Sequence, residues 1–86
     1  MKYRSRTEII ETILDTANGG ASKTNIMYKA FLSYTQLREY LSMLVDNNLL
    51  SHDDPKIYRL TEKGLNYLRM STELGHLLQT IRKDYS

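Results

Sequence analysis

The chain has 86 residues, of which 41% are hydrophobic and 26% are charged, and its formal net charge is +2. This composition is typical of one small globular domain and argues against a disordered polar tail. The absence of cysteine excludes disulfides and thiolate metal sites, and no apolar run approaches the roughly 20 residues that span a bilayer. No charged-then-apolar signal sequence opens the chain, so we expect a cytoplasmic protein that does not associate with membranes.

A first helix is predicted over residues 6–18. The S-x-x-E pattern that begins at Ser5 is a capping box, in which the serine and glutamate side chains each accept a backbone N–H from the other residue. Apolar residues then recur at helical spacing until Asn18-Gly19-Gly20, a sequence that favours the left-handed conformation in which helices end. Ser22 can cap a second, shorter helix that runs to about Phe31.

A third helix is predicted over about residues 33–47. Ser33 and Gln36 form a second capping box, and Leu32 and Leu37 stand at the positions of a hydrophobic staple. The apolar positions of this helix fall on one side and its polar positions on the other, so the helix is amphipathic. Two local devices at one helix start indicate that the orientation of the third helix relative to the second is specified by the sequence.

A short β-hairpin is predicted next, with strands at residues 49–52 and 56–60 on either side of Asp53-Asp54-Pro55. Thr61 can then cap a final helix that continues to about residue 84. The order of helix, helix, tight turn, helix, hairpin and long helix is typical of a winged helix-turn-helix with an added C-terminal helix.

We therefore expect a mainly α fold with a small β-hairpin. Residues 1–61 would form the winged helix-turn-helix domain, and residues 62–86 would form a long C-terminal helix for dimerisation through a coiled coil.

The final helix has apolar residues at spacings of three and four, which is the pattern of a coiled-coil seam. The stretch from Met70 to Ile81 would extend about 16 Å at 1.5 Å per residue, beyond what one small core can cover. We expect this seam to form a homodimer, and the alternative is a helix that folds back on its own domain. Gly75 either permits a close helix crossing or weakens the helix. The predicted interface residues are Tyr67, Met70, Leu74, Leu77, Leu78 and Ile81.

Several segments carry a family resemblance. These segments are Asn25-Ile26-Met27-Tyr28, Leu32-Ser33-Tyr34, Tyr40-Leu41 with Leu44, and Tyr58-Arg59-Leu60-Thr61-Glu62-Lys63-Gly64. The last matches the Y-x-L-T-x-K-G pattern of archaeal winged-helix regulators, and over about residues 5–70 the chain resembles the ten-a family of small archaeal winged-helix DNA-binding proteins. The resemblance implies a homodimer joined through antiparallel C-terminal helices. It also implies binding of double-stranded DNA, as a nucleoid-associated chromatin protein or as a transcriptional regulator.

A DNA-binding face is predicted around the third helix, because the second helix of a helix-turn-helix enters the major groove with its N-terminal part. Polar side chains there bond base edges, and nearby cations neutralise phosphates. Gln36 ranks lower than its neighbours, since a glutamine engaged in a capping bond does not read a base freely. The alternative is an ordinary solvated helix face. The predicted DNA-binding residues are Lys23, Thr24, Lys29, Tyr34, Thr35, Gln36, Arg38, Ser42, Lys56 and Arg59.

The sequence also contains several tyrosines and a basic N-terminus. We assign Tyr40 and Tyr58 to the core, take Tyr34 as the interface tyrosine and leave Tyr28 undecided. The basic arm of Lys2, Arg4 and Arg6 either lies along a DNA groove or extends into solvent.

His52, Asp53 and Asp54 form the one cluster that resembles a metal site, but three adjacent turn residues rarely aim at one point, so a solvated turn is preferred. Without a nucleophile-base pattern or a phosphate loop, the sequence predicts a protein that is not an enzyme and has no metal or cofactor. Two other functions stay open. A winged-helix module that binds a partner protein instead of DNA is suggested by the low net charge and the acidic turn, and an effector-sensing regulator is a weaker alternative.

Overall fold

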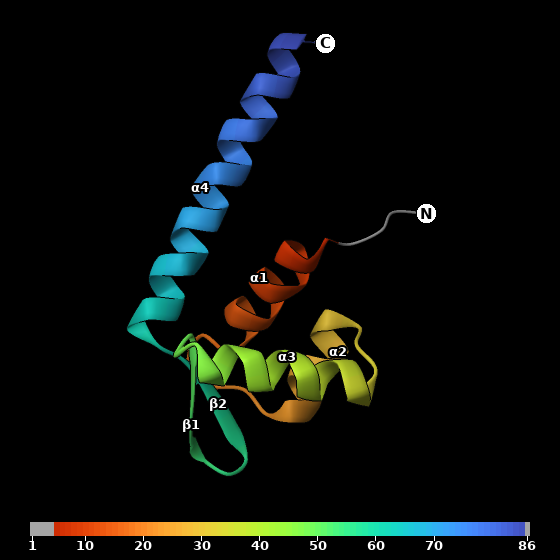
Figure 1. The fold of residues 1–86 in the computed structure, drawn as a ribbon, viewed down its shortest axis with the longest axis vertical. Helices are drawn as coiled ribbons and strands as arrows, with labels where there is room; N and C mark the ends of the chain where they lie inside the picture. The colour runs from red at the N-terminus through yellow and green to blue at the C-terminus, as the bar shows by residue number, and fades with distance from the viewer. Residues whose placement is uncertain (1–4, 86) are drawn as a thin grey trace.

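The computed structural model describes the backbone of residues 5–85 and the side chains of residues 5–77. The elements in chain order are α1 (Arg6–Thr16), α2 (Lys23–Ala30), α3 (Tyr34–Asp46), β1 (Leu50–Asp54), β2 (Ile57–Leu60) and α4 (Glu62–Tyr85). The first three helices and the antiparallel hairpin gather at one end of the molecule, and α4 extends away from them (Figure 1). The structure confirms the predicted winged-helix fold, which is mainly α with a small hairpin.

Serine side chains begin α1 and α2, as the sequence predicts. The Oγ of Ser5 accepts the backbone N–H of Glu8 at 3.0 Å, and the Oε1 of Glu8 accepts the N–H of Ser5 at 3.1 Å. The Oγ of Ser22 accepts a backbone N–H of the first turn of α2 at 3.1 Å. Between these helices Gly19 and Gly20 have φ angles of +89° and +105°, which only glycine adopts without strain. The chain can therefore reverse within a few residues.

The core lies where α1, α2 and α3 meet the hairpin. β2 is attached to the connection between α1 and α2, because Ala21 N–H donates to Tyr58 O at 2.9 Å and Tyr58 N–H donates to Ala21 O at 2.8 Å. These two bonds hold the hairpin against the helices. The buried hydrophobic residues are Ile13, Leu14, Ala17, Ala21, Ile26, Ala30, Leu32, Leu37, Leu41, Leu44, Leu50 and Tyr58.

The hairpin has a shorter turn than the sequence predicts. β1 continues through Asp54, so Pro55 and Lys56 alone form the turn instead of Asp53-Asp54-Pro55. The physical reason is that the Oδ1 of Asp54 accepts the backbone N–H of Lys56 at 2.9 Å, which closes the chain reversal. The Asp54 carboxylate therefore stabilises the turn.

Three consecutive carbonyl groups after α3 hold the start of α4. Asn47 O accepts a hydrogen bond from Lys63 Nζ at 2.9 Å, and Asn48 O accepts one from Thr61 Oγ1 at 2.6 Å. Leu49 O accepts the backbone N–H of Thr61 at 3.2 Å. These carbonyl groups follow Asp46, the last residue of α3, and lie beyond the hydrogen bonds of the helix, so the contacts from the start of α4 satisfy them. We call this set of contacts the α3–α4 junction.

Gly64 completes the α3–α4 junction. Its N–H donates to Thr61 Oγ1 at 2.9 Å, which caps α4, and its α-carbon packs against the backbone of Leu49. A Cβ at this position would overlap the Leu49 carbonyl oxygen and lie 2.6 Å from Leu60 Cδ1. Glycine is required here because of close packing, since the backbone is helical.

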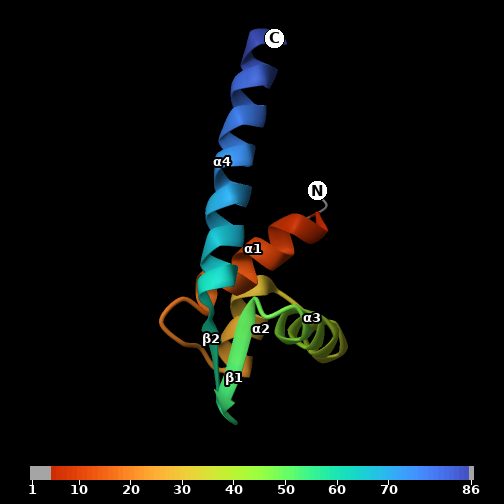
Figure 2. The same ribbon diagram turned by 60° about the vertical axis from the view of Figure 1, so that its left-hand side comes forward.

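The first part of α4 packs on the domain, and its later part does not. Leu65 and Leu68 are half-buried, and the Oγ of Ser71 donates to the Oε1 of Glu11 on α1 at 2.9 Å. Figures 1 and 2 both show that α4 then leaves the other elements, so that its C-terminal half stands apart. The junction and the bond between Ser71 and Glu11 fix the direction in which α4 leaves.

The close packing of Gly64 predicts a large cost for adding one methyl group. Gly64→Ala should lower the free energy of unfolding by about 1 to 3 kcal/mol, because the overlap with Leu49 outweighs the helix propensity of alanine. Gly75→Ala is the matched control, since nothing lies within 4 Å of a Cβ there and the change should stabilise α4. Urea denaturation of both variants at one protein concentration is the measurement. A Gly64→Ala variant as stable as the wild type would contradict this account of the junction.

Candidate nucleic-acid interface

The N-terminus of α3 is fixed by its capping box. The Oγ of Ser33 accepts the N–H of Gln36 at 3.2 Å, and the Oε1 of Gln36 accepts the N–H of Ser33 at 3.1 Å. This arrangement confirms the predicted cap. The amide oxygen of Gln36 is engaged with the backbone, which leaves its neighbours as the stronger candidates for contacting a ligand.

One side of α3 faces outward along its whole length. Leu37, Leu41 and Leu44 turn into the core, whereas Thr35, Arg38 and Ser42 are exposed, as expected for an amphipathic helix. Tyr34 in the first turn is 57% exposed, and the guanidinium carbon of Arg38 lies 5.9 Å from its ring centroid. This cation–π contact restrains the Arg38 side chain at the surface.

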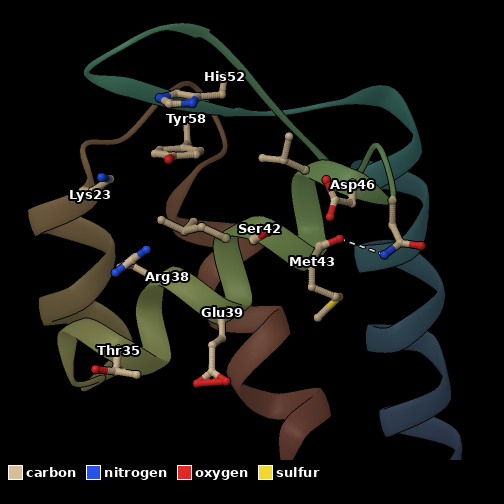
Figure 3. A pocket seen from close by; sticks show the side chains of 12 residues that line it. Lys23, Thr35, Arg38, Glu39, Ser42, Met43, Asp46, His52 and Tyr58 are labelled. Carbon is tan, nitrogen blue, oxygen red and sulfur yellow. Dashed lines mark hydrogen bonds between the residues drawn. The ribbon is translucent and has the colours of Figure 1, made fainter.

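A groove of about 800 Å³ separates this side of α3 from the hairpin (Figure 3). Lys23 of α2 borders one end, Arg38 and Ser42 of α3 form the floor, and His52 and Tyr58 of the hairpin form the opposite wall. Figure 3 shows the Arg38 guanidinium directed toward the side of α2 on which Lys23 lies. Two cations thus face the same end of the groove, an arrangement suited to an anion such as a phosphate.

His52 builds the hairpin wall of the groove. Its ring stacks on that of Tyr58, with centroids 4.0 Å apart and an interplanar angle of 7°. Its Nε2 lies 3.1 Å from the carbonyl oxygen of Pro55, so Nε2–H donates and the ring is held in place. From the sequence, His52 is considered only as part of a possible metal site, because nothing in the predicted hairpin places its ring on that of Tyr58.

Six of the predicted DNA-binding residues do not border this groove. Arg59 points to the other side of β2, where its Nη1 donates to Gly19 O at 3.3 Å. Thr24 and Lys29 are exposed on α2, and Lys56 is exposed at the hairpin turn. Tyr34 and Gln36 lie in the first turn of α3, and Gln36 borders a smaller hollow with Arg6 and Tyr40. Lys23, Thr35, Arg38 and Ser42 are therefore the predicted residues that the groove brings together.

The assignment of two tyrosines to the core agrees with the structure. Tyr58 is 6% exposed and Tyr40 is half-buried against the core, as predicted. Tyr28, which the sequence left undecided, is 72% exposed on α2. The guanidinium carbon of Arg6 lies 5.7 Å from the Tyr40 ring centroid, so this member of the basic arm is placed on α1, whereas Lys2 and Arg4 lie outside the described residues.

An apolar stripe follows α4 beyond the domain. Met70, Leu74 and Leu77 are 69%, 58% and 58% exposed, at the spacing of four and three that the sequence showed. Tyr67 is half-buried at the point where α4 leaves the core. The other two predicted interface side chains, those of Leu78 and Ile81, lie outside the described residues.

No three His, Asp or Glu side chains among those described are placed to hold a metal ion. Among the described residues, no helix combines the length and the apolar character that crossing a membrane requires.

Comparisons with known proteins agree with this architecture. A family model described as winged helix-turn-helix matches residues 3–79. Among solved structures, the chain is similar to Sso10a-2, a DNA-binding protein from Sulfolobus solfataricus, with 27% sequence identity and a TM-score of 0.83. That similarity covers 95% of this chain and 90% of the other. Comparison with curated proteins finds no match.

The helix-turn-helix formed by α2 and α3, with the hairpin beside it, defines the class of winged-helix proteins. The family match covers most of the chain, and the chain belongs to the winged helix-turn-helix family. The similarity to Sso10a-2 further supports the resemblance to small archaeal winged-helix proteins that the sequence indicates.

Proposed function

We propose that this protein binds double-stranded DNA, with α3 in the major groove and the hairpin beside the flanking backbone. The observation that supports this most directly is the pair of cations, Lys23 and Arg38, at the end of a groove that borders the exposed side of α3. The description of Sso10a-2 as a DNA-binding protein adds support from a structure of the same fold. The N-terminus of α3 also favours negative charge, because its backbone N–H groups point outward.

The contacts divide into two kinds. Thr35, Arg38 and Ser42 would face base edges, since they occupy the exposed side of α3 near its start. Lys23 would bind a phosphate from the groove, and Lys56 would bind one from the hairpin turn. Tyr34 would donate its phenol hydroxyl to a phosphate, and Gln36 would contribute least because of its capping bond. Thr24 and Lys29 would add backbone contacts from α2.

The same proposal includes a homodimer. Residues 1–61 would form the DNA-binding unit and residues 62–86 the dimerisation helix, through the stripe of Met70, Leu74 and Leu77. Two copies of α3 held in this way would meet half-sites about one helical turn, or roughly 34 Å, apart. Such a dimer would act as a transcriptional regulator or as a nucleoid-associated chromatin protein.

A second candidate function is binding of a partner protein through the same surface. The observation that favours it is the presence of Glu39 and Asp46 beside the groove and of Asp53 on the hairpin, because carboxylates repel phosphates. Purification with a stoichiometric protein partner, together with no duplex binding, would select this alternative over DNA binding.

DNA binding predicts a strong salt dependence. Phosphate contacts from Lys23, Lys29 and Lys56 in both protomers of the dimer should give a slope of about −5 in a plot of log affinity against log salt concentration, because each contact releases condensed counterions. Titration of a labelled duplex by fluorescence anisotropy at several salt concentrations measures this slope. No binding at low salt, or an affinity that does not change with salt, would reject the proposal.

The two cations of the groove should act differently on DNA. Arg38→Ala should weaken binding by about 1 to 3 kcal/mol and change the preferred sequence, since Arg38 would contact bases. Lys23→Ala should weaken binding to all duplexes alike and reduce the salt slope by about 1. Arg69→Ala is the control, because Arg69 is exposed on α4 away from the groove. Unchanged binding by both groove variants would mean that another face contacts DNA.

The dimer has its own test. Leu77→Asp should raise the dissociation constant by about two orders of magnitude or more, because one buried leucine contributes about 1.5 to 3 kcal/mol and the dimer buries two. Thr72→Asp is the control, since Thr72 is exposed about 140° around α4 from Leu77. Sedimentation equilibrium at micromolar concentration distinguishes the outcomes. A wild-type monomer, or a Leu77→Asp variant of unchanged mass, would refute the seam.

A further inference from the structure

Glu39 stands on the outermost line of α3. At about 100° per residue it lies about 200° around the helix from the buried residues Leu37 and Leu41. It borders both the large groove and a smaller hollow of about 250 Å³ on the other side of α3, which is lined by Arg6, Gln36, Glu39 and Tyr40. A side chain that borders hollows on both sides lies on the crest between them. If α3 enters a DNA groove, this crest reaches deepest.

The Glu39 carboxylate has no partner among the described residues. Figure 3 shows it directed away from the Arg38 guanidinium, which faces α2. Arg6 borders the same small hollow, but its guanidinium lies over the Tyr40 ring at 5.7 Å from the centroid. Within residues 5–77, no hydrogen bond or ion pair engages the carboxylate, so its acceptor oxygens face outward.

An ionised carboxylate accepts hydrogen bonds and cannot donate them. A phosphate also only accepts, so Glu39 repels the DNA backbone and can bond DNA only through a donor on a base edge. In the major groove those donors are the amino groups of cytosine and adenine. In adenine the N7 acceptor lies beside the amino group, so N7 would face the second carboxylate oxygen, which is also an acceptor. The amino group of cytosine has no such neighbour and fits an acceptor-only side chain.

We propose that Glu39 is a specificity-determining residue that accepts a hydrogen bond from the amino group of cytosine. This inference rests on the proposed insertion of α3 into the major groove. Where guanine or thymine lies opposite the carboxylate, the major-groove edge of that base presents no donor, and the carboxylate would lose its water without gaining a partner, which is unfavourable. Glu39 therefore both selects cytosine and rejects other sequences. Its position favours selective sites over uniform coating of DNA.

Selection from a random duplex pool tests this inference. Full-length wild type, Glu39→Gln and Glu39→Ala are each used to retain duplexes, and the retained DNA is sequenced. Glu62→Gln is the matched control, because Glu62 is also an exposed glutamate but begins α4. Thermal unfolding of each variant verifies that α3 is intact.

We expect wild type and Glu62→Gln to share a cytosine at one position in each half-site. Glu39→Gln should show a preference for cytosine that is about tenfold weaker than that of the wild type. It should instead prefer adenine, because glutamine can bond both the amino group and N7 of that base. Glu39→Ala should lose the preference without gaining adenine. Removal of the charge should also raise the affinity of both variants for random duplexes.

Two outcomes would overturn the inference while leaving DNA binding intact. One is a wild type that retains duplexes without any preference for cytosine. The other is a Glu39→Gln variant that keeps the wild-type preference. Failure of the proposed function looks different, because the wild type would then retain no duplex at all.

Discussion

The α3–α4 junction is the constraint on which the functional geometry depends. The carbonyl groups of Asn47, Asn48 and Leu49 directly follow α3, and Thr61 and Lys63 supply their hydrogen-bond partners from the start of α4. Because these hydrogen bonds join three consecutive carbonyl groups to Thr61 and Lys63, which are close in the sequence, they fix the angle between α3 and α4. The helix that carries the proposed DNA contacts is thereby tied to the helix proposed for dimerisation.

The junction also explains the Y-x-L-T-x-K-G pattern in physical terms. Tyr58 packs in the core and supports His52, Thr61 caps α4 while bonding the end of α3, and Lys63 satisfies one more carbonyl. Gly64 permits the backbone approach that brings these groups together. Tyr58, Thr61, Lys63 and Gly64 each therefore have a structural role at their position in the pattern.

The sequence predicts the fold well because local signals and the final contacts agree. The serine caps at Ser5, Ser22 and Ser33 place three helix starts, and the glycines after α1 place its end. The candidate site is less predictable, because it depends on which residues from distant elements meet. Lys23 and Arg38 are predictable because their positions on helices indicate which side they face. Arg59 instead contacts Gly19, and His52 borders the groove, because the alternation of side chains along the strands decides which face each residue occupies.

Because the groove beside α3 carries both cations and carboxylates, tight DNA binding as proposed would depend on the proposed dimer. A protomer with few cations, and with Glu39 on the crest of α3, gains little from phosphates alone and must rely on a small number of base contacts. Joining two protomers converts the second encounter into an intramolecular one, which raises affinity without any new contact, provided that both copies of α3 fit the duplex together. Because the α3–α4 junction sets the direction of α4, it would also set, in the proposed dimer, the separation of half-sites at which that condition holds.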